Sequence, residues 1–237
     1  MHSPFIFALV TKCFYDRHYY EEYEELKSYR AKLLKNKNSI TITDLGSGSK
    51  VFKTDRRYID TMAKTSGSSL KQSKLLFRMV RFFNPGSVLE LGTNLGIGTH
   101  AMALGNPRAK ITSIEGCKEI IKVANTSLSN AHVRNFATHL GNFKDVIPKL
   151  PLKKWDLIFF DGHHSKEATL QYFEQLLPFA HNDSIFIFDD IYWSKDMTDT
   201  WNIIKNHPKT TVTVDIFQWG IVFFRKEQRK EHFKIRV

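Results

Sequence analysis

The feature that most constrains the fold of this chain is a regular alternation of strand-like and helix-like segments from Leu70 onward. Short apolar runs such as "SVLELG", "WDLIFFDG" and "SIFIFDD" are separated by longer amphipathic runs such as "LKQSKLLFRMVRFF". This alternation is typical of a parallel sheet covered by helices on both faces. We therefore expect an α/β protein with a Rossmann-like, doubly wound sheet.

The end of the pattern is different. The segments "TVTVDIF" and "GIVFFRK" are joined by the very short "QWG", whereas a parallel crossover needs about a dozen residues or more. Only an antiparallel hairpin fits so short a connection. The expected sheet is therefore mostly parallel and seven-stranded, with a C-terminal antiparallel hairpin.

Residues 1–65 do not follow the alternation, and we interpret them as an N-terminal helical appendage or lid on a main domain of residues 66–237. Residues 14–35 predict an amphipathic helix, with acidic residues early and lysines late, the order that suits the helix dipole. The segment "HSPFIFALV" leaves two alternatives open: it packs on its own domain, or on a second copy in a homodimer.

Composition limits the binding partners and the cellular compartment that we expect for this protein. The net charge of +11 favours either a solvated basic surface or an anionic partner such as nucleic acid. Two distant cysteines, Cys13 and Cys117, form neither a disulfide framework nor a metal-binding pattern. The N-terminus lacks the features of a signal peptide, and no apolar run approaches the roughly 18 residues of a membrane span. We expect a cytoplasmic protein.

The stretch "VLELGTNLGIGTH" runs from a strand into a helix and carries Glu90, Gly92, Gly96 and Gly98. Its G-x-x-x-G-x-G spacing differs from the dinucleotide-binding pattern. The next strand ends in Glu115, and a carboxylate there can accept hydrogen bonds from both hydroxyls of a ribose. Because both features fall at the carboxyl edge of the sheet, they predict a nucleoside-binding site; the alternative is a simple tight turn.

A second stretch, "ITITDLGSGSK", also places an acid, Asp44, before glycines, Gly46 and Gly48. No amphipathic helix follows it, and no acid-tipped strand comes next. We interpret this stretch as a loop.

Two adjacent aspartates, Asp189 and Asp190, end the apolar run "SIFIFDD". Neighbouring carboxylates repel each other unless a cation lies between them. Hard oxygen ligands suit Mg²⁺, Mn²⁺ or Ca²⁺. The alternative is that one aspartate caps the following helix while the other faces solvent.

Five stretches in this order resemble the class I S-adenosylmethionine-dependent methyltransferases: "VLELGTNLGIGT", "ITSIEG", "GNFKDVIPKL", "WDLIFFDGHH" and "SIFIFDDIYW". The nearest resemblance is to the metal-dependent O-methyltransferase branch typified by catechol O-methyltransferase and bacterial sugar O-methyltransferases. It covers about residues 66–225 and implies S-adenosylmethionine as cofactor and a small molecule as substrate. The cofactor-binding residues that it implies are Glu90, Gly92, Asn94, Gly96, Glu115, Asn142, Phe143 and Asp161.

The resemblance also implies a divalent metal, most simply Mg²⁺, bound by Asp161, Asp189 and Asp190. Catechol O-methyltransferase has a lysine three residues after the first metal-binding aspartate. Here that position is His164, with Lys166 just beyond, so His164 together with Asp161 is the predicted catalytic pair.

Neighbouring side chains receive weaker predictions. His163 is a candidate further neighbour of the metal. Tyr192 and Trp193 are candidate walls of the substrate pocket, and Arg56, Arg57 and Lys71 are candidates to meet an anionic substrate.

Two other functions compete with this one. The basic charge favours a nucleic-acid methyltransferase, although the fourth strand ends in "DGHH" rather than in the Asp/Asn-Pro-Pro-aromatic signature of enzymes that methylate amino groups. The other is a binding module that keeps the fold without catalysis.

Overall fold

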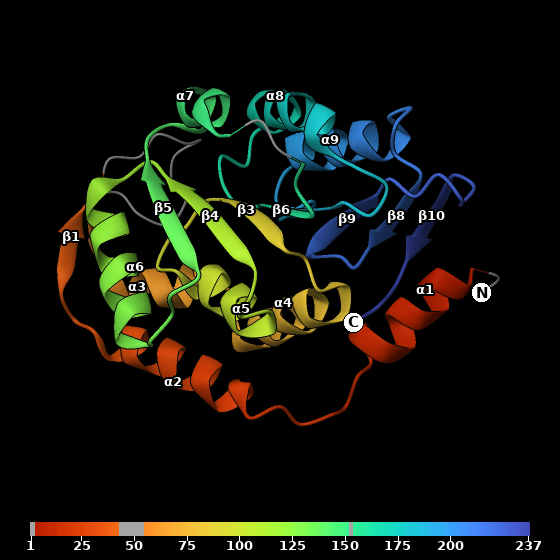
Figure 1. Cartoon of the computed structure of the whole chain (residues 1–237). Helices are drawn as coiled ribbons and strands as arrows, with labels where there is room; N and C mark the ends of the chain where they lie inside the picture. Colours follow the sequence, from red (N-terminus) through yellow and green to blue (C-terminus); the bar gives the residue numbers. More distant parts are fainter. Residues whose placement is uncertain (1–2, 43–54, 152–153) are drawn as a thin grey trace.

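A twisted eight-stranded sheet runs through the middle of the molecule, with helices on both of its faces (Figure 1). The computed structural model describes residues 3–42, 55–151 and 154–237. The strands of this sheet are β3 (Ser87–Leu91), β4 (Lys110–Glu115), β5 (Phe136–Leu140), β6 (Leu157–Phe160), β7 (Ile185–Asp189), β8 (Val212–Asp215), β9 (Trp219–Phe223) and β10 (Glu231–Lys234). The predicted α/β, Rossmann-like class is confirmed.

The strand order is β10-β8-β9-β7-β6-β3-β4-β5. All neighbours are parallel except β9, which pairs antiparallel with both β7 and β8. The predicted hairpin is therefore present, and its second strand lies inside the sheet. The strands β6, β7 and β9 are buried along almost their whole length, as expected where helices cover both faces.

The prediction of seven strands was one too few, because β10 adds an eighth. It pairs parallel with β8, in the register Glu231↔Val212. The C-terminal charge run concealed a period-two pattern, in which Phe233, Ile235 and Val237 pack against the core while charged residues alternate with them.

The helices form two groups. They are α1 (Pro4–Leu9), α2 (Glu22–Lys35), α3 (Ile59–Thr65), α4 (Leu70–Phe83), α5 (Ile97–Gly105) and α6 (Lys118–Asn130) in one group, and α7 (Phe143–Val146), α8 (Lys166–Leu176) and α9 (Lys195–Asn206) in the other. Each group shares one apolar cluster with its face of the sheet. In Figure 1 the second group lies above the sheet and α2, α4 and α5 lie below it.

The N-terminal segment packs on its own domain. Ile6 and Leu9 of α1 are fully buried in the same cluster as the sheet, and the ring of Phe5 meets that of Phe223 edge-on at 4.9 Å. Arg78 of α4 donates hydrogen bonds to the carbonyls of Cys13 and Phe14. Of the two alternatives for this segment the structure shows the first, and a homodimer stays a prediction.

The predicted helix over 14–35 is wrong in its first part. A short π-helical turn, Val10–Phe14, follows α1, and regular α-helix begins again only at Glu22. The buried face of α2 includes Tyr29, while Tyr19 is 61% exposed. A small antiparallel pair, β1 (Ser39–Thr41) and β2 (Arg56–Tyr58), then leads into α3. The stretch with Asp44, Gly46 and Gly48 lies outside the described residues.

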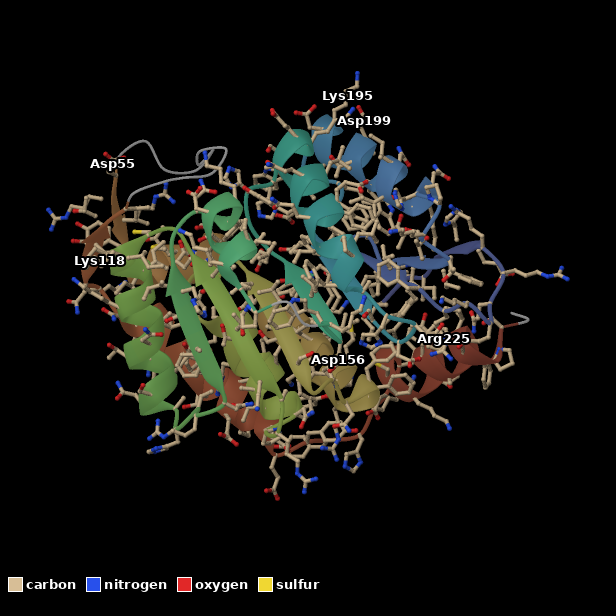
Figure 2. All side chains as sticks on the ribbon, turned by 45° about the horizontal axis from the view of Figure 1, so that its top comes forward. Asp55, Lys118, Asp156, Lys195, Asp199 and Arg225 are labelled. Carbon is tan, nitrogen blue, oxygen red and sulfur yellow. The ribbon has the colours of Figure 1, made fainter. Side chains whose placement is uncertain are left out.

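The amino edge of the sheet is held by Asp156, just before β6. Its Oδ2 accepts hydrogen bonds from the backbone N–H groups of Gly86 and Ser87, each at 2.8 Å, and its Oδ1 lies 2.9 Å from His181 Nε2. Figure 2 shows Asp156 and Arg225 at the lower right, away from Lys118 and Lys195, which follow the carboxyl ends of β4 and β7. The two edges therefore carry different groups, and the candidate site lies at the carboxyl edge.

None of the described helices combines the length and the apolar character needed to cross a bilayer. The thiols of Cys13 and Cys117 are both buried.

The packing of α4 against α5 yields a stability prediction. A Cβ added at Gly105 would lie 2.7 Å from the backbone oxygen of Phe77 and 2.8 Å from Val80 Cβ, neither of which can rotate away. We expect Gly105→Ala to lower the free energy of unfolding by about 1–3 kcal/mol. Gly86→Ala is the matched control, because its added Cβ meets nothing closer than 3.5 Å. Equal urea-denaturation midpoints for the two variants would contradict the prediction.

Candidate functional site

A cavity of about 220 Å³ opens at the carboxyl edge of the sheet, beside the ends of β3, β4 and β6. Its walls include Gly92, Asn94, Glu115, Asn142, Phe143 and Asp161. These residues come from four segments that are far apart in the sequence, and every one of them was predicted as a cofactor-binding residue. Open α/β sheets bind ligands at this edge, where the strand order reverses between β3 and β6.

The loop after β3 is held tightly in place. Gly92 has φ +107°, and a Cβ added to it would lie 2.0 Å from the backbone oxygen of Asp161. The loop also receives support from β4, because Gly92 N–H donates to the carbonyl of Ile114 at 2.9 Å. Only glycine can occupy this position, since any side chain would collide with the end of β6.

Glu115 is fixed by the backbone on both of its oxygens. Its Oε2 accepts a hydrogen bond from Asn94 N–H and its Oε1 accepts one from Cys117 N–H, each at 3.0 Å. A carboxylate can accept about four hydrogen bonds, so these two leave it able to accept ribose hydroxyls as well. Asn94 itself has φ +46°, a conformation that asparagine tolerates better than most residues.

The opposite wall is aromatic. Phe143 begins α7, whose N-terminus is capped by the side chain of Asn142. The Phe143 ring lies 5.5 Å from that of Tyr172 and 6.1 Å from that of His163. His163, for which a place beside the metal was a weaker prediction, therefore lines the cavity on the side of Phe143.

The N-terminal segment contributes walls that the sequence analysis did not place in the cofactor pocket: Ile42, Arg57, Met62 and Ser66. Asn94 Nδ2 donates to the backbone oxygen of Ser66 at 2.7 Å, which ties this segment to the glycine loop. Arg57 was predicted only as a partner for an anionic substrate. No local pattern marks these residues, because β2 and α3 reach the cavity only through the packing of the fold.

Glu90 and Gly96 lie behind the loop. Glu90 is 1% exposed, and its Oε2 accepts hydrogen bonds from the hydroxyls of Thr99 and Ser113, each at 2.5 Å. A Cβ on Gly96 would lie 2.8 Å from the Tyr29 hydroxyl, and one on Gly98 would lie 2.7 Å from Glu90 Oε1. Glu90 borders, with Gly92 and Asp161, a hollow of only about 10 Å³. These groups support the loop from inside the protein.

The three predicted metal-binding carboxylates lie close enough to interact. Burial raises the pKa of Asp161 well above its usual value, and Asp189 and Asp190 raise it further, Asp189 also through a side-chain hydrogen bond. Burial and the charge of Asp189 raise the pKa of Asp190 to about 6, against a smaller lowering by His164. Asp190 has φ +55°. The structure therefore concentrates negative charge at the tips of β6 and β7.

The oxygen atoms of these three carboxylates are possible ligands for a metal ion. Asp189 Oδ1 is buried and has no hydrogen-bond partner among the described residues, so one buried acceptor is left without a donor. The described ranges contain no group of three His, Cys, Asp or Glu side chains arranged to hold a metal. The donor chemistry and the unpartnered oxygen suit a hard divalent cation, and the metal site itself stays a prediction.

The remaining candidates are spread along the same edge. His164 Nε2 lies 3.9 Å from Asp161 Oδ1, and Lys166 begins α8. Trp193 is 50% exposed after β7. Lys71 and Tyr192 line a different cavity, while Arg56 lies in β2, where its Nε donates to Ser39 Oγ at 2.8 Å.

Comparison with known proteins agrees with this geometry. Residues 89–191, which run from the glycine loop to the aspartate pair, match the family model of a methyltransferase domain. This matched segment, which is less than half of the chain, resembles a methyltransferase domain. The predicted resemblance is confirmed, and with it the expectation of a methyltransferase enzyme at the level of the family. No curated protein gives a significant match to the whole sequence.

Solved structures share the fold of this chain. The O-methyltransferase TomG from Streptomyces achromogenes, in complex with SAM, is 19% identical over 68% of this chain and 82% of its own, with a TM-score of 0.59. The SAH-bound methyltransferase PaMTH1 from Podospora anserina is 15% identical over 95% and 97%, with a TM-score of 0.65. An O-methyltransferase from Bacillus cereus in complex with SAH is 16% identical over 92% and 96%, with a TM-score of 0.57.

Glu90 yields a prediction about pH. Burial raises its pKa from 4.5 to about 7 in the folded protein. Between these values the folded state holds a proton that the unfolded state has lost, so the stability of the wild type falls as the pH rises. Glu90→Gln removes this titration. We expect the variant to gain on the order of 2–3 kcal/mol relative to wild type between pH 4.5 and pH 8, measured by urea unfolding at both pH values. A constant difference between the two proteins would contradict the raised pKa.

Proposed function

We propose that this protein is an S-adenosylmethionine-dependent O-methyltransferase that acts on a hydroxyl of a small molecule with the help of a divalent cation. The single observation that carries the proposal is the position of Glu115. Its carboxylate is held by two backbone N–H groups and lines the same cavity as the glycine loop and Asp161. A nucleoside-binding acid thus lies in the same cavity as a member of the acidic cluster.

The residues of the cavity suit the parts of the cofactor. Glu115 would accept hydrogen bonds from the ribose hydroxyls, and the aromatic ring of Phe143 offers an apolar surface for the adenine. The loop from Gly92 to Gly96 would bind the methionine part, with Glu90 and Gly96 supporting it from behind. When bound, S-adenosylmethionine supplies an electrophilic methyl group.

Asp161, Asp189 and Asp190 would hold the cation, most simply Mg²⁺. Such a cation lowers the pKa of a substrate hydroxyl and orients it. The carboxylates that now raise one another's pKa would then be neutralised by a positive charge. A bound cation would therefore offset the electrostatic repulsion among the three carboxylates at this edge.

His164 is the group best placed to accept the proton of the substrate hydroxyl. It is 25% exposed and lies beside Asp161, where a carboxylate can orient the imidazole. Histidine exchanges protons near neutral pH. The bound acceptor and cofactor need only be held in line, because positioning supplies much of the acceleration in a transfer of this kind.

Glu115→Gln tests the cofactor site. The substitution keeps the shape of the side chain but removes the charge that strengthens hydrogen bonds to ribose. We expect calorimetric titration with S-adenosylhomocysteine to show binding to the wild type and binding about ten- to a hundredfold weaker to the variant. Glu119→Gln is the control, because Glu119 lies in the same region but pairs with Lys122 at the surface. A folded wild type that does not bind S-adenosylhomocysteine would refute the proposal.

Asp189→Asn tests the cation without requiring a known substrate. Millimolar Mg²⁺ should raise the unfolding temperature of the wild type by a few degrees, because the ion binds the folded state only. The variant should lose this response and keep its affinity for S-adenosylhomocysteine. Asp183→Asn, at an exposed aspartate before β7, should respond like the wild type. A wild type that is insensitive to Mg²⁺, Mn²⁺ and Ca²⁺ would remove metal assistance from the proposal.

A further inference from the structure

A second cavity, of about 870 Å³, lies on the same edge of the sheet beyond the aspartate pair. It is lined by the turn between β8 and β9 and by the end of the chain after β10. It adjoins the acidic cluster directly, because Asp190 N–H donates to the backbone oxygen of Gln218, which lines the cavity, at 2.9 Å. A molecule whose hydroxyl lies at the aspartates could therefore extend into this space.

The turn in this cavity presents an aromatic ring at an energetic cost. Phe217 is 77% exposed and has φ +74°, a conformation that is strained for a bulky side chain. A structure optimised only for stability would carry glycine at such a position. Strain and an exposed apolar ring at the same residue indicate that the ring is retained for contact with a ligand.

Asp215 holds this arrangement in place. It is 7% exposed, its Oδ1 accepts a hydrogen bond from Phe217 N–H at 2.9 Å, and its Oδ2 accepts one from the Tyr192 hydroxyl. The rings of Tyr192 and Phe217 lie 5.6 Å apart. One buried carboxylate thus orients two aromatic groups that line the same cavity.

The charges in the cavity are mainly positive. Lys71, Lys234 and Arg236 line it, and all three are exposed. Asp215, an acid of this wall, has its two oxygens engaged by Phe217 and Tyr192, and Lys71 Nζ donates to the backbone oxygen of Val237 at 2.7 Å. Lys234 lies in β10 and Arg236 follows it, so both belong to the part of the chain beyond the region that matches the methyltransferase family.

We propose that this cavity binds the distal part of the methyl acceptor, and that the acceptor is a ring-containing small molecule that bears an anionic group. The ring packs on Phe217, and a carboxylate or phosphate pairs with Lys234 and Arg236. This inference rests on the proposed function and deepens it, because it assigns a substrate class to residues that lie beyond the segment matching the methyltransferase family.

The test uses matched pairs of neutral and acidic probes. The full-length protein, saturated with S-adenosylhomocysteine and Mg²⁺, is titrated with catechol and 3,4-dihydroxybenzoate, and with glucose and glucose 6-phosphate. In at least one pair we expect the acidic member to bind tenfold or more tightly than the neutral one. Equal affinity within both pairs, or absence of binding by all four probes, would overturn the inference.

Two double variants test whether Lys234 and Arg236 cause the preference for the acidic probe. Lys234→Met combined with Arg236→Met should reduce the preference for the acidic probe about tenfold and leave affinity for the neutral probe and for S-adenosylhomocysteine unchanged. Lys226→Met combined with Arg229→Met removes the same charge from exposed residues between β9 and β10 and should change nothing. If both double variants lower the affinity equally, general attraction by the basic surface explains the binding and the inference fails.

Phe217→Gly separates a role in binding from a role in folding. Glycine relieves the strained φ, so the variant should unfold at the same or a higher temperature than the wild type while binding the acidic probe about tenfold more weakly. A variant that is less stable and binds normally would show that Phe217 serves the fold alone.

Three results distinguish failure of this inference from failure of the proposed function. If S-adenosylhomocysteine does not bind, the proposed function itself fails. If it binds, and a single-stranded RNA oligonucleotide rather than the small acids binds in a manner that the Lys234 and Arg236 variants abolish, cofactor binding stands, but the small-molecule acceptor of the proposed function and the present inference are both wrong. If it binds and the acidic and neutral probes bind equally, only the present inference is wrong.

Discussion

The contact between Gly92 and the backbone of Asp161 is the constraint on which the candidate site depends. A Cβ at Gly92 would overlap the Asp161 carbonyl oxygen, and the N–H of Asp161 donates to Leu91 at 2.9 Å. The end of β6 and the glycine loop are therefore locked together. Because β4 supports the same loop through Ile114, Glu115 and the first aspartate of the acidic cluster are held at a fixed spacing.

The electrostatics of this edge differ from those of the molecule as a whole. The chain carries a net charge of +11, yet Asp161, Asp189, Asp190 and Glu90 gather at or just behind the carboxyl edge, where burial raises the pKa of Asp161, Asp190 and Glu90. Such a cluster lowers stability unless a ligand compensates it. The basic residues beyond the cluster suit an anionic group of the substrate, so opposite charges along one edge would orient a single acceptor.

The N-terminal segment contributes residues to the site although no sequence motif marks them. Tyr29 of α2 donates to the carbonyl of Leu95 in the glycine loop at 2.8 Å, and its ring stacks on His100. Arg57 and Met62 complete the wall of the cavity that contains Glu115 and Asp161. These contacts connect the appendage with the cavity, although none of its residues lies within the region that matches the methyltransferase family.

The local sequence determined every strand of the main sheet except β10, as well as the helices after Leu70. It also determined the glycine loop and the acids at the strand tips. Strand–helix periodicity can be read from neighbouring residues, and parallel strands end at one edge of the sheet. The strand β10 was missed, since a run of charges hid an alternation that matters only beside β8. Only the tertiary structure decided that Glu90 and Gly96 lie behind the loop and that Ile42, Arg57, Met62 and Ser66 line the cavity. It also decided that Phe217 is exposed beside Lys234 and Arg236. These features depend on packing between segments distant in the chain, and no local pattern encodes such contacts.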